Sequence, residues 1–183
     1  AGLTKAELIQ LEAGGLVLPA KGHKNPRGTS FIEATLVFDR PPDEVWRLLS
    51  ETEAQHRYLA EIRSLQTIWK SEARHCLEFT VKALGRTLVY RAVHDFFPET
   101  LSFSWSLDPG PKCDLRELDG FWRLYAFGER RTLARYGSVA KPRFPVPRFI
   151  REAETRRRTR PSLAAVKKYV DSGGAWRLGR EGD

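Results

Sequence analysis

The feature that most constrains the fold is a long succession of strand patterns, from Ile62 to Ala140, that no long helix interrupts. Apolar and polar residues alternate along it, most clearly in LSFSWSL at 101–107, where serines separate the apolar residues. Turn-forming segments such as FPET and DPGPKCD separate the strands. Because parallel strands need long crossover connections, the sequence predicts an antiparallel sheet.

Helical patterns flank this region. SFIEATLVFDR at 30–40 predicts a first strand, and PPDEVWRLLSETEAQHRYL at 41–59 changes to the helical period and predicts two short helices. A long helix is expected from about Pro145 to Asp171, ended by a Gly-Gly pair, and a small one at Thr4–Glu12, with Thr4 and Glu7 as a capping box. LVLP at 16–19 is expected to be a brief strand.

The predicted fold class is therefore α+β. A curved antiparallel sheet of about seven strands wraps round a long C-terminal helix, with two short helices after the first strand and a small N-terminal helix. We expect an N-terminal helix, short strand and loop over residues 1–28, the main domain over 29–173 and a tail over 174–183. The 183 residues suit one domain, and no run of eighteen apolar residues predicts a membrane span.

A curved sheet covered by one long helix leaves room for a cavity, and such cavities hold apolar ligands. Large aromatic side chains are predicted on the concave face, where they either line this cavity or simply fill the core. These are Phe79, Tyr90, Phe103, Trp105 and Trp122.

The last helix has two displaced apolar stripes. The first is Val146, Phe149, Ile150 and Ala153; Arg157 falls inside it and Arg160 at its edge. The second, Leu163, Val166 and Val170, is rotated by roughly a third of a turn. A kink at Pro161 would let both stripes face the sheet, with Arg157 pointing inward and Arg156 and Arg158 in solvent.

The net charge of +8 is concentrated in the Lys141–Lys168 segment, which has ten basic residues against Glu152 and Glu154. Three interpretations remain: a solvated face, a nucleic-acid site, or contact with an anionic membrane surface, with Arg157 reaching a ligand's acidic head. The rest of the chain is neutral and no recognition motif accompanies the charge, so no nucleic-acid partner is predicted.

No motif demands catalysis. The chain contains no nucleophile elbow, Walker, HExxH or GxGxxG pattern, so we predict no catalytic residue, cofactor or metal. His94 shares a strand face with Tyr90 and is either a general base or a structural histidine. Cys76 and Cys113 lack metal-type spacing; they either pair or stay free.

Three segments carry a family resemblance: FDRPPDEVWRLLSETEAQHRYLAEI, LDPGPKCDLRELDGFWRLYAFGERRTLARYGSVA and PVPRFIREAETRRRTRPSLAAVKKYV. They resemble the opening strand-turn-helix, the late strand pair and the C-terminal helix of the START/Bet v 1-like (SRPBCC) superfamily. Within it, the chain is most similar to polyketide cyclase/dehydrase and coenzyme Q-binding bacterial START proteins. The resemblance covers about Thr29 to Asp171.

The resemblance implies a helix-grip fold with a hydrophobic tunnel that binds or moves a lipid, sterol or hopanoid, quinone or polyketide. An aromatase/cyclase-type enzyme is the alternative, with Tyr90, His94 or Arg157 giving acid-base help. Asp108–Lys112 and Pro142–Pro147 are the expected gates. The predicted cavity-lining residues are Phe79, Tyr90, His94, Phe103, Trp105, Trp122, Leu124, Tyr136, Phe149, Ala153 and Arg157.

The resemblance also bears on location. The chain begins with Ala1 and has no methionine, which fits either simple trimming or a removed export signal. LTKAELIQLEAGG looks like the leader of exported bacterial members, which favours the bacterial periplasm, with the cytoplasm as the alternative. The sequence predicts no oligomeric state.

Overall fold

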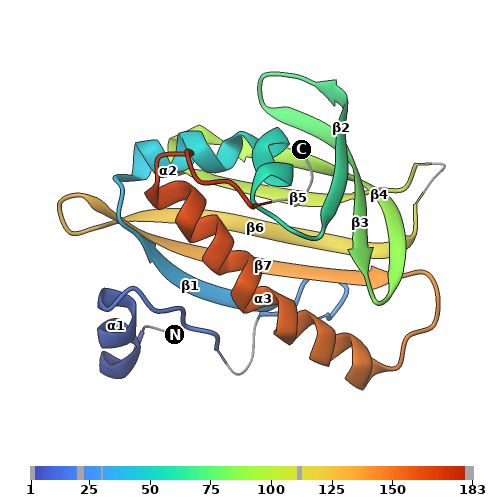
Figure 1. Ribbon diagram of the computed structural model, residues 1–183, viewed down its shortest axis with the longest axis horizontal. Helices are drawn as coiled ribbons and strands as arrows, with labels where there is room; N and C mark the ends of the chain where they lie inside the picture. Colours follow the sequence, from blue (N-terminus) through green and yellow to red (C-terminus); the bar gives the residue numbers. More distant parts are fainter. Residues whose placement is uncertain (1–2, 20–22, 30, 111–112, 180–183) are drawn as a thin grey trace.

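Seven antiparallel strands form one curved sheet in the computed structural model, which describes residues 3–19, 23–29, 31–110 and 113–179 (Figure 1). Its order is β1-β7-β6-β5-β4-β3-β2, so the first strand pairs with the last. The strands are β1 Ile32–Phe38, β2 Ile62–Lys70, β3 Arg74–Ala83, β4 Arg86–Phe97, β5 Ser102–Asp108, β6 Leu115–Phe127 and β7 Arg131–Pro142.

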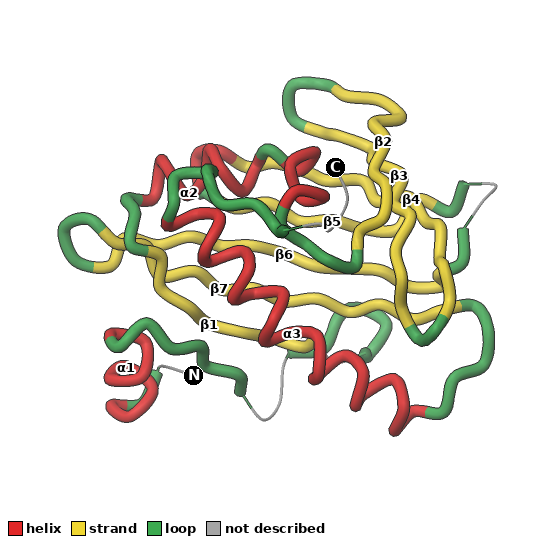
Figure 2. The backbone as a smooth tube through the Cα atoms, in the orientation of Figure 1, coloured by secondary structure: helices red, strands yellow, loops and turns green. Residues whose placement is uncertain are grey.

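The long helix α3, Arg148–Asp171, runs across the concave face, and the predicted helix-grip fold is confirmed (Figure 2). Two shorter helices follow β1, as predicted: α2 Pro42–Ser50 and the 3-10 helix η1 Thr52–Arg57. A second 3-10 helix, η2 Pro98–Thr100, joins β4 to β5. None of the described helices is long and apolar enough to cross a membrane.

The N-terminal helix α1 spans Lys5–Glu12, and its predicted capping box is present. The Thr4 side chain accepts a hydrogen bond from the Glu7 amide, and the Glu7 carboxylate accepts one from the Thr4 amide. The brief strand expected at LVLP is only an isolated bridge between Val17 and Thr35. A strand there would need a continuous ladder along the edge of β1, and a single bridge gives none.

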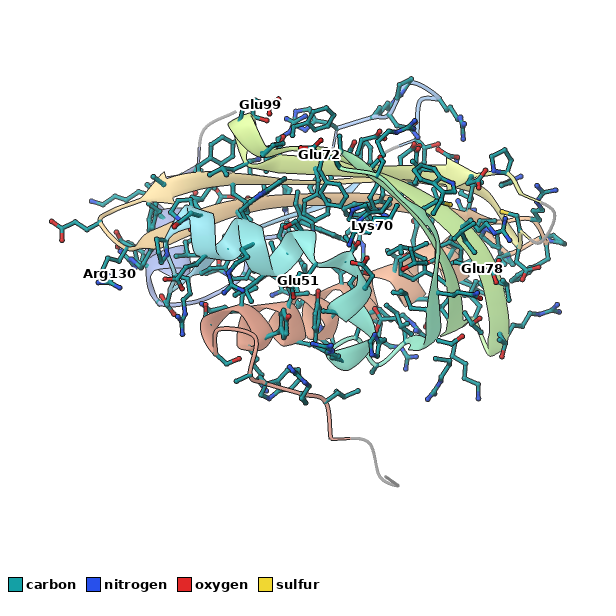
Figure 3. All side chains as sticks on the ribbon, turned by 90° about the horizontal axis from the view of Figure 1, so that it is seen from above. Glu51, Lys70, Glu72, Glu78, Glu99 and Arg130 are labelled. Atoms are coloured by element: carbon teal, nitrogen blue, oxygen red, sulfur yellow. The ribbon has the colours of Figure 1, made fainter. Side chains whose placement is uncertain are left out.

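Two buried clusters make up most of the core. The first joins β1 and α2 to the second half of α3. These three elements contribute the buried side chains of Phe38, Val45 and Tyr169, respectively. The second lies under the β3–β4 end of the sheet and includes Leu77 and Leu88. Charged side chains such as Glu99 and Arg130 lie on the outside of the molecule (Figure 3).

Irregularities in the ladder bend the sheet toward α3. The β2–β3 register shifts twice, between Ile62 and Ser64 and between Thr67 and Trp69. An extra residue in one strand increases its bend and twist. In Figure 1 the β2–β3 end of the sheet curls up from the plane of the other strands, which gives the sheet its concave face. Cys76 and Cys113, whose pairing the sequence left open, are both free thiols.

Candidate functional site

A cavity of about 340 Å³ lies between the concave face of the sheet and the first half of α3. Both core clusters contribute to its wall, as with Leu163 and Val166 from the first and Leu88 and Leu118 from the second. The cavity therefore lies within the hydrophobic core, between its two clusters. Its volume falls in the range of small-molecule pockets.

Seven of the eleven predicted lining residues surround this cavity, and all come from the sheet. The period-two pattern of β3 to β7 puts them on one face, because alternate residues of a strand point to the same side. They are Phe79, Tyr90, His94, Phe103, Trp105, Trp122 and Tyr136. Their rings contact one another; Phe79 stacks on Tyr90 at 5.3 Å between centroids, and Trp122 meets Tyr136 at 4.9 Å.

Gly120 lets the Trp105 indole lie flat on the floor of the cavity. It pairs with Trp105 across the β5–β6 ladder, and a Cβ at this position would lie 2.0 Å from the indole carbons. The indole can lie over the strand only because this residue has no side chain. A glycine here therefore preserves volume that an upright Trp105 would occupy.

His94 is a buried, neutral histidine at the base of the cavity. It is 2% exposed, its ring has Phe79, Phe103 and Trp105 within 6.5 Å, and its Nδ1 has no hydrogen-bond partner. Burial, with a smaller effect of His75 on the neighbouring strand, lowers the pKa of His94 to about 4. The imidazole is thus uncharged at neutral pH.

The phenols that line the cavity are hydrogen-bond donors. Burial raises the pKa of Tyr58, Tyr90 and Tyr136 above the ordinary value, so each keeps its proton at neutral pH. Glu61 also lines the cavity, and its carboxylate accepts a hydrogen bond from the Ser162 hydroxyl of α3 at 3.0 Å. The wall therefore offers a few polar contacts within a mostly aromatic surface.

Most of the α3 residues that line the cavity are polar. The polar residues are Arg151, Glu154, Thr155, Arg158, Thr159 and Ser162. Glu154 accepts hydrogen bonds from Arg158 Nε at 2.6 Å and pairs with Arg157 Nη2 at 3.2 Å, and these two guanidinium groups lower its pKa. Arg158 Nη1 also donates to the Lys82 carbonyl at 2.7 Å. Arg158 therefore ties α3 to the end of β3.

Three predicted lining residues, Phe149, Ala153 and Arg157, lie outside the cavity. Phe149 is 72% exposed, Ala153 is exposed, and the Arg157 side chain is 76% exposed. The predicted stripe had the wrong helical phase. Leu163, which is buried, is followed toward the N-terminus at steps of four by Thr159, Thr155 and Arg151, all of which line the cavity.

The same spacing explains Arg157. It lies two residues from Thr155 and from Thr159, about 200° round the helix from each, so it faces solvent. The second predicted stripe, with Leu163 and Val166, is therefore the inward one, and it continues through the proline of α3. The first, with Phe149, Ile150 and Ala153, faces solvent. Leu124, the remaining predicted residue, is 4% exposed and packs in the first core cluster instead of lining the cavity.

The sequence prediction missed the residues between α2 and β3, among them Tyr58, Leu59 and Ile62, which close one side of the cavity. Their segment combines a 3-10 helix with a bulged strand, and neither gives a clean period. The polar α3 positions were also missed. Extending the Leu163 stripe backward at steps of four would have found three of them, Thr159, Thr155 and Arg151.

Among the described side chains, three of the ten basic residues in the Lys141–Lys168 segment form close ion pairs with carboxylates. Lys141 pairs with Glu117, Lys167 with Asp171, and Arg158 with Glu154, each within 2.7 Å.

Solved structures share this fold, whereas a scan of protein-family models and a search of curated proteins gave no match. TTHA0849 from Thermus thermophilus aligns with a TM-score of 0.69 at 19% identity over 79% of this chain and 99% of that one. The Zhui aromatase/cyclase from Streptomyces sp. R1128 gives 0.67 at 17% identity, over 77% and 93%. A START superfamily protein from Mycobacterium smegmatis gives 0.66 at 14% identity, over 78% and 97%. The chain has the START/Bet v 1-like (SRPBCC) fold.

Proposed function

We propose that this START-like chain binds a hydrophobic or amphipathic small molecule in its cavity and carries it between membranes or to a partner. A lipid, a sterol or hopanoid, a quinone and a polyketide are the candidate classes. The observation that carries the proposal is the aromatic cavity of about 340 Å³ at which both core clusters stop. A fold that needed only stability would fill this space, because protein interiors are close-packed.

Enclosure alone supplies enough free energy for binding. Burial of apolar surface contributes roughly 25 cal/mol per Å², so a ligand that hides about 300 Å² gains about 7 kcal/mol before the cost of immobilisation. The neutral His94 and the protonated phenols add hydrogen bonds without placing a charge against an apolar ligand. Covalent chemistry is not required for this function.

Entry and release need a gate, and the end of β3 beside α3 is the best candidate. Arg158 joins Lys82 to Glu154 there, and Leu84 in the adjoining turn lines the cavity. Of the gates expected from sequence, Asp108–Lys112 extends beyond the described residues. In Pro142–Pro147, Phe144 packs against the second core cluster with the Arg86 guanidinium 4.7 Å from its ring.

Peripheral contact with an anionic membrane belongs to the same proposal. Phe149 and Ile150 are exposed at the start of α3, and Arg156 and Arg160 are exposed further along it. Apolar side chains enter the interface while nearby cations attract anionic headgroups, at about 1 kcal/mol per basic residue. This arrangement would deliver the ligand beside the bilayer.

An aromatase/cyclase-type enzyme is the second candidate. It is favoured by the buried, unpartnered Nδ1 of His94 in an aromatic cavity and by the aromatase/cyclase among the similar structures. A pKa of about 4 makes His94 a weak base at neutral pH, and Arg157 points to solvent, so neither is well suited to the acid-base role expected from sequence. The carrier is therefore the preferred function.

Native mass spectrometry of the purified protein, followed by organic extraction, tests the proposal. We expect a co-purified apolar molecule, and uptake of the neutral fluorescent probe N-phenyl-1-naphthylamine by the emptied protein. Transfer of a lipid between vesicles with no change in its mass supports a carrier. Conversion of a polyketide-like compound, lost in Tyr90→Phe or His94→Gln while probe binding survives, supports the enzyme instead. A protein that takes up neither probe nor lipid contradicts both.

A further inference from the structure

A second pocket, a groove of about 920 Å³, lies beside the first half of α3, between that helix, the β1–β7 edge and the N-terminal segment. The proposed function places no part of the ligand in it. Its lining residues come from the N-terminal segment, β1, β7 and α3.

The groove and the aromatic cavity are adjacent spaces with a common wall. Six residues line both: Ile32, Ser138, Ala140, Arg151, Thr155 and Thr159. Three come from β1 and β7 and three from α3. A molecule lying between these strands and α3 would therefore touch the aromatic cavity with one end and the groove with the other.

The groove is much more cationic than the cavity. Its lining includes five basic side chains, Lys24, Lys141, Arg151, Arg156 and Arg160, against Glu33 and Glu152. Lys141 is already paired with Glu117 at 2.6 Å. Glu33 is likewise engaged, by His23 Nδ1 at 2.7 Å and Arg135 Nη2 at 3.6 Å.

The other four cations are unpaired within the described part of the chain, and Arg151 has a special position among them. Lys24, Arg156 and Arg160 are exposed, whereas Arg151 is half-buried on the wall that both spaces share. The Thr155 and Thr159 hydroxyls on that wall each donate to the carbonyl four residues earlier, so their oxygens remain acceptors. Arg151 is thus the charged donor at the junction. A half-buried guanidinium without a carboxylate partner favours an anion beside it.

We propose that the groove takes the anionic head, a phosphate or carboxylate, of an amphipathic ligand whose apolar part lies in the aromatic cavity. Arg151 contacts the head at the junction, and Arg156, Arg160 and Lys24 hold it in the groove. This inference rests on the proposed function and adds the ligand class to it. A guanidinium binds such groups through paired hydrogen bonds, which an uncharged head would not form.

The test is displacement of N-phenyl-1-naphthylamine from the full chain by two matched amphiphiles, dodecyl phosphate and dodecanol, each below its aggregation limit. We expect dodecyl phosphate to displace the probe at about tenfold lower concentration than dodecanol, the effect of one charge-assisted interaction. Arg151→Gln is expected to remove most of this preference. Arg157→Gln, an exposed arginine outside both pockets, is the matched control and keeps it.

Each outcome decides one question. No probe binding at all contradicts the cavity and so the proposed function. Probe binding with equal displacement by the two amphiphiles overturns the anionic-head inference alone, as does a preference that Arg151→Gln and Arg157→Gln reduce equally. Millimolar inorganic phosphate separates the two sources of the head. If it abolishes the preference for dodecyl phosphate, the groove binds free phosphate; if it does not, binding requires the attached chain.

Discussion

The two halves of α3 are built on the same helix but meet different surroundings. In the second half, Leu163, Tyr169 and Val170 are at most 3% exposed and pack in the first core cluster. In the first half, polar side chains face the cavity while Phe149 and Ile150 face solvent. The second half of α3 therefore stabilises the fold, whereas the first half covers a ligand space and does not need an apolar inward stripe.

Replacing one aromatic residue in each half should separate these roles most clearly. Tyr169→Ala removes a 1% exposed ring that stacks on Tyr58 at 4.2 Å, and we expect it to lower the free energy of unfolding by about 3–5 kcal/mol. Phe149→Ala removes an exposed ring and should change it by less than about 0.5 kcal/mol. Urea unfolding followed by circular dichroism measures both. Similar losses for the two variants would mean that the first half also packs against the fold.

The floor beneath the first half gives the second prediction. Gly120→Ala places a methyl group 2.0 Å from the Trp105 indole, which must then rise into the cavity. We expect a loss of about 3 kcal/mol in the free energy of unfolding, at the upper end of overpacking effects, and weaker probe binding.

Gly179→Ala is its control, because a Cβ there meets nothing within 4 Å. Urea unfolding and titration with N-phenyl-1-naphthylamine are the measurements. An unchanged affinity in Gly120→Ala would show that the ligand space does not extend over Trp105.

The third prediction concerns pH. An unfolded histidine gains a proton below about pH 6.5, whereas folded His94 stays neutral down to about pH 4. Since the unfolded chain binds more protons in this window, stability is full above pH 6.5 and falls as the pH drops toward 4. The loss from His94 should reach about 2 kcal/mol between pH 7 and pH 5.

The measurement is urea unfolding at several pH values for the native chain and for His94→Leu. The variant should show a shallower dependence, although His75, whose pKa burial also lowers, keeps part of it. Identical profiles would mean that His94 is hydrated through the cavity.

The sequence predicted the parts of the molecule in which side chains contact protein. The alternating strands, the Thr4 capping box and the inward aromatics of the sheet all follow from periodicity, because an apolar side chain marks a buried face where that face is packed. Above the cavity this relation fails. Thr155 and Thr159 face inward while Phe149 does not, so the most apolar stripe gave the wrong phase and put Arg157 on the wrong side. The register of the second half, which starts at Leu163, carried the correct phase for the whole helix.

The smallest expected effect comes from two neighbouring arginines in the first half. Arg158 joins Glu154 to the Lys82 carbonyl, whereas Arg157 pairs with Glu154 from a 76% exposed position. Such partly exposed contacts contribute at most about 1 kcal/mol, so Arg158→Gln should leave the fold nearly as stable as before. If this contact closes the cavity, the same 1 kcal/mol should make N-phenyl-1-naphthylamine dissociate about fivefold faster, with a smaller change in association. Arg157→Gln should leave the stopped-flow dissociation rate unchanged. Equal rates in the two variants would mean that ligands leave by a route that does not pass between β3 and α3.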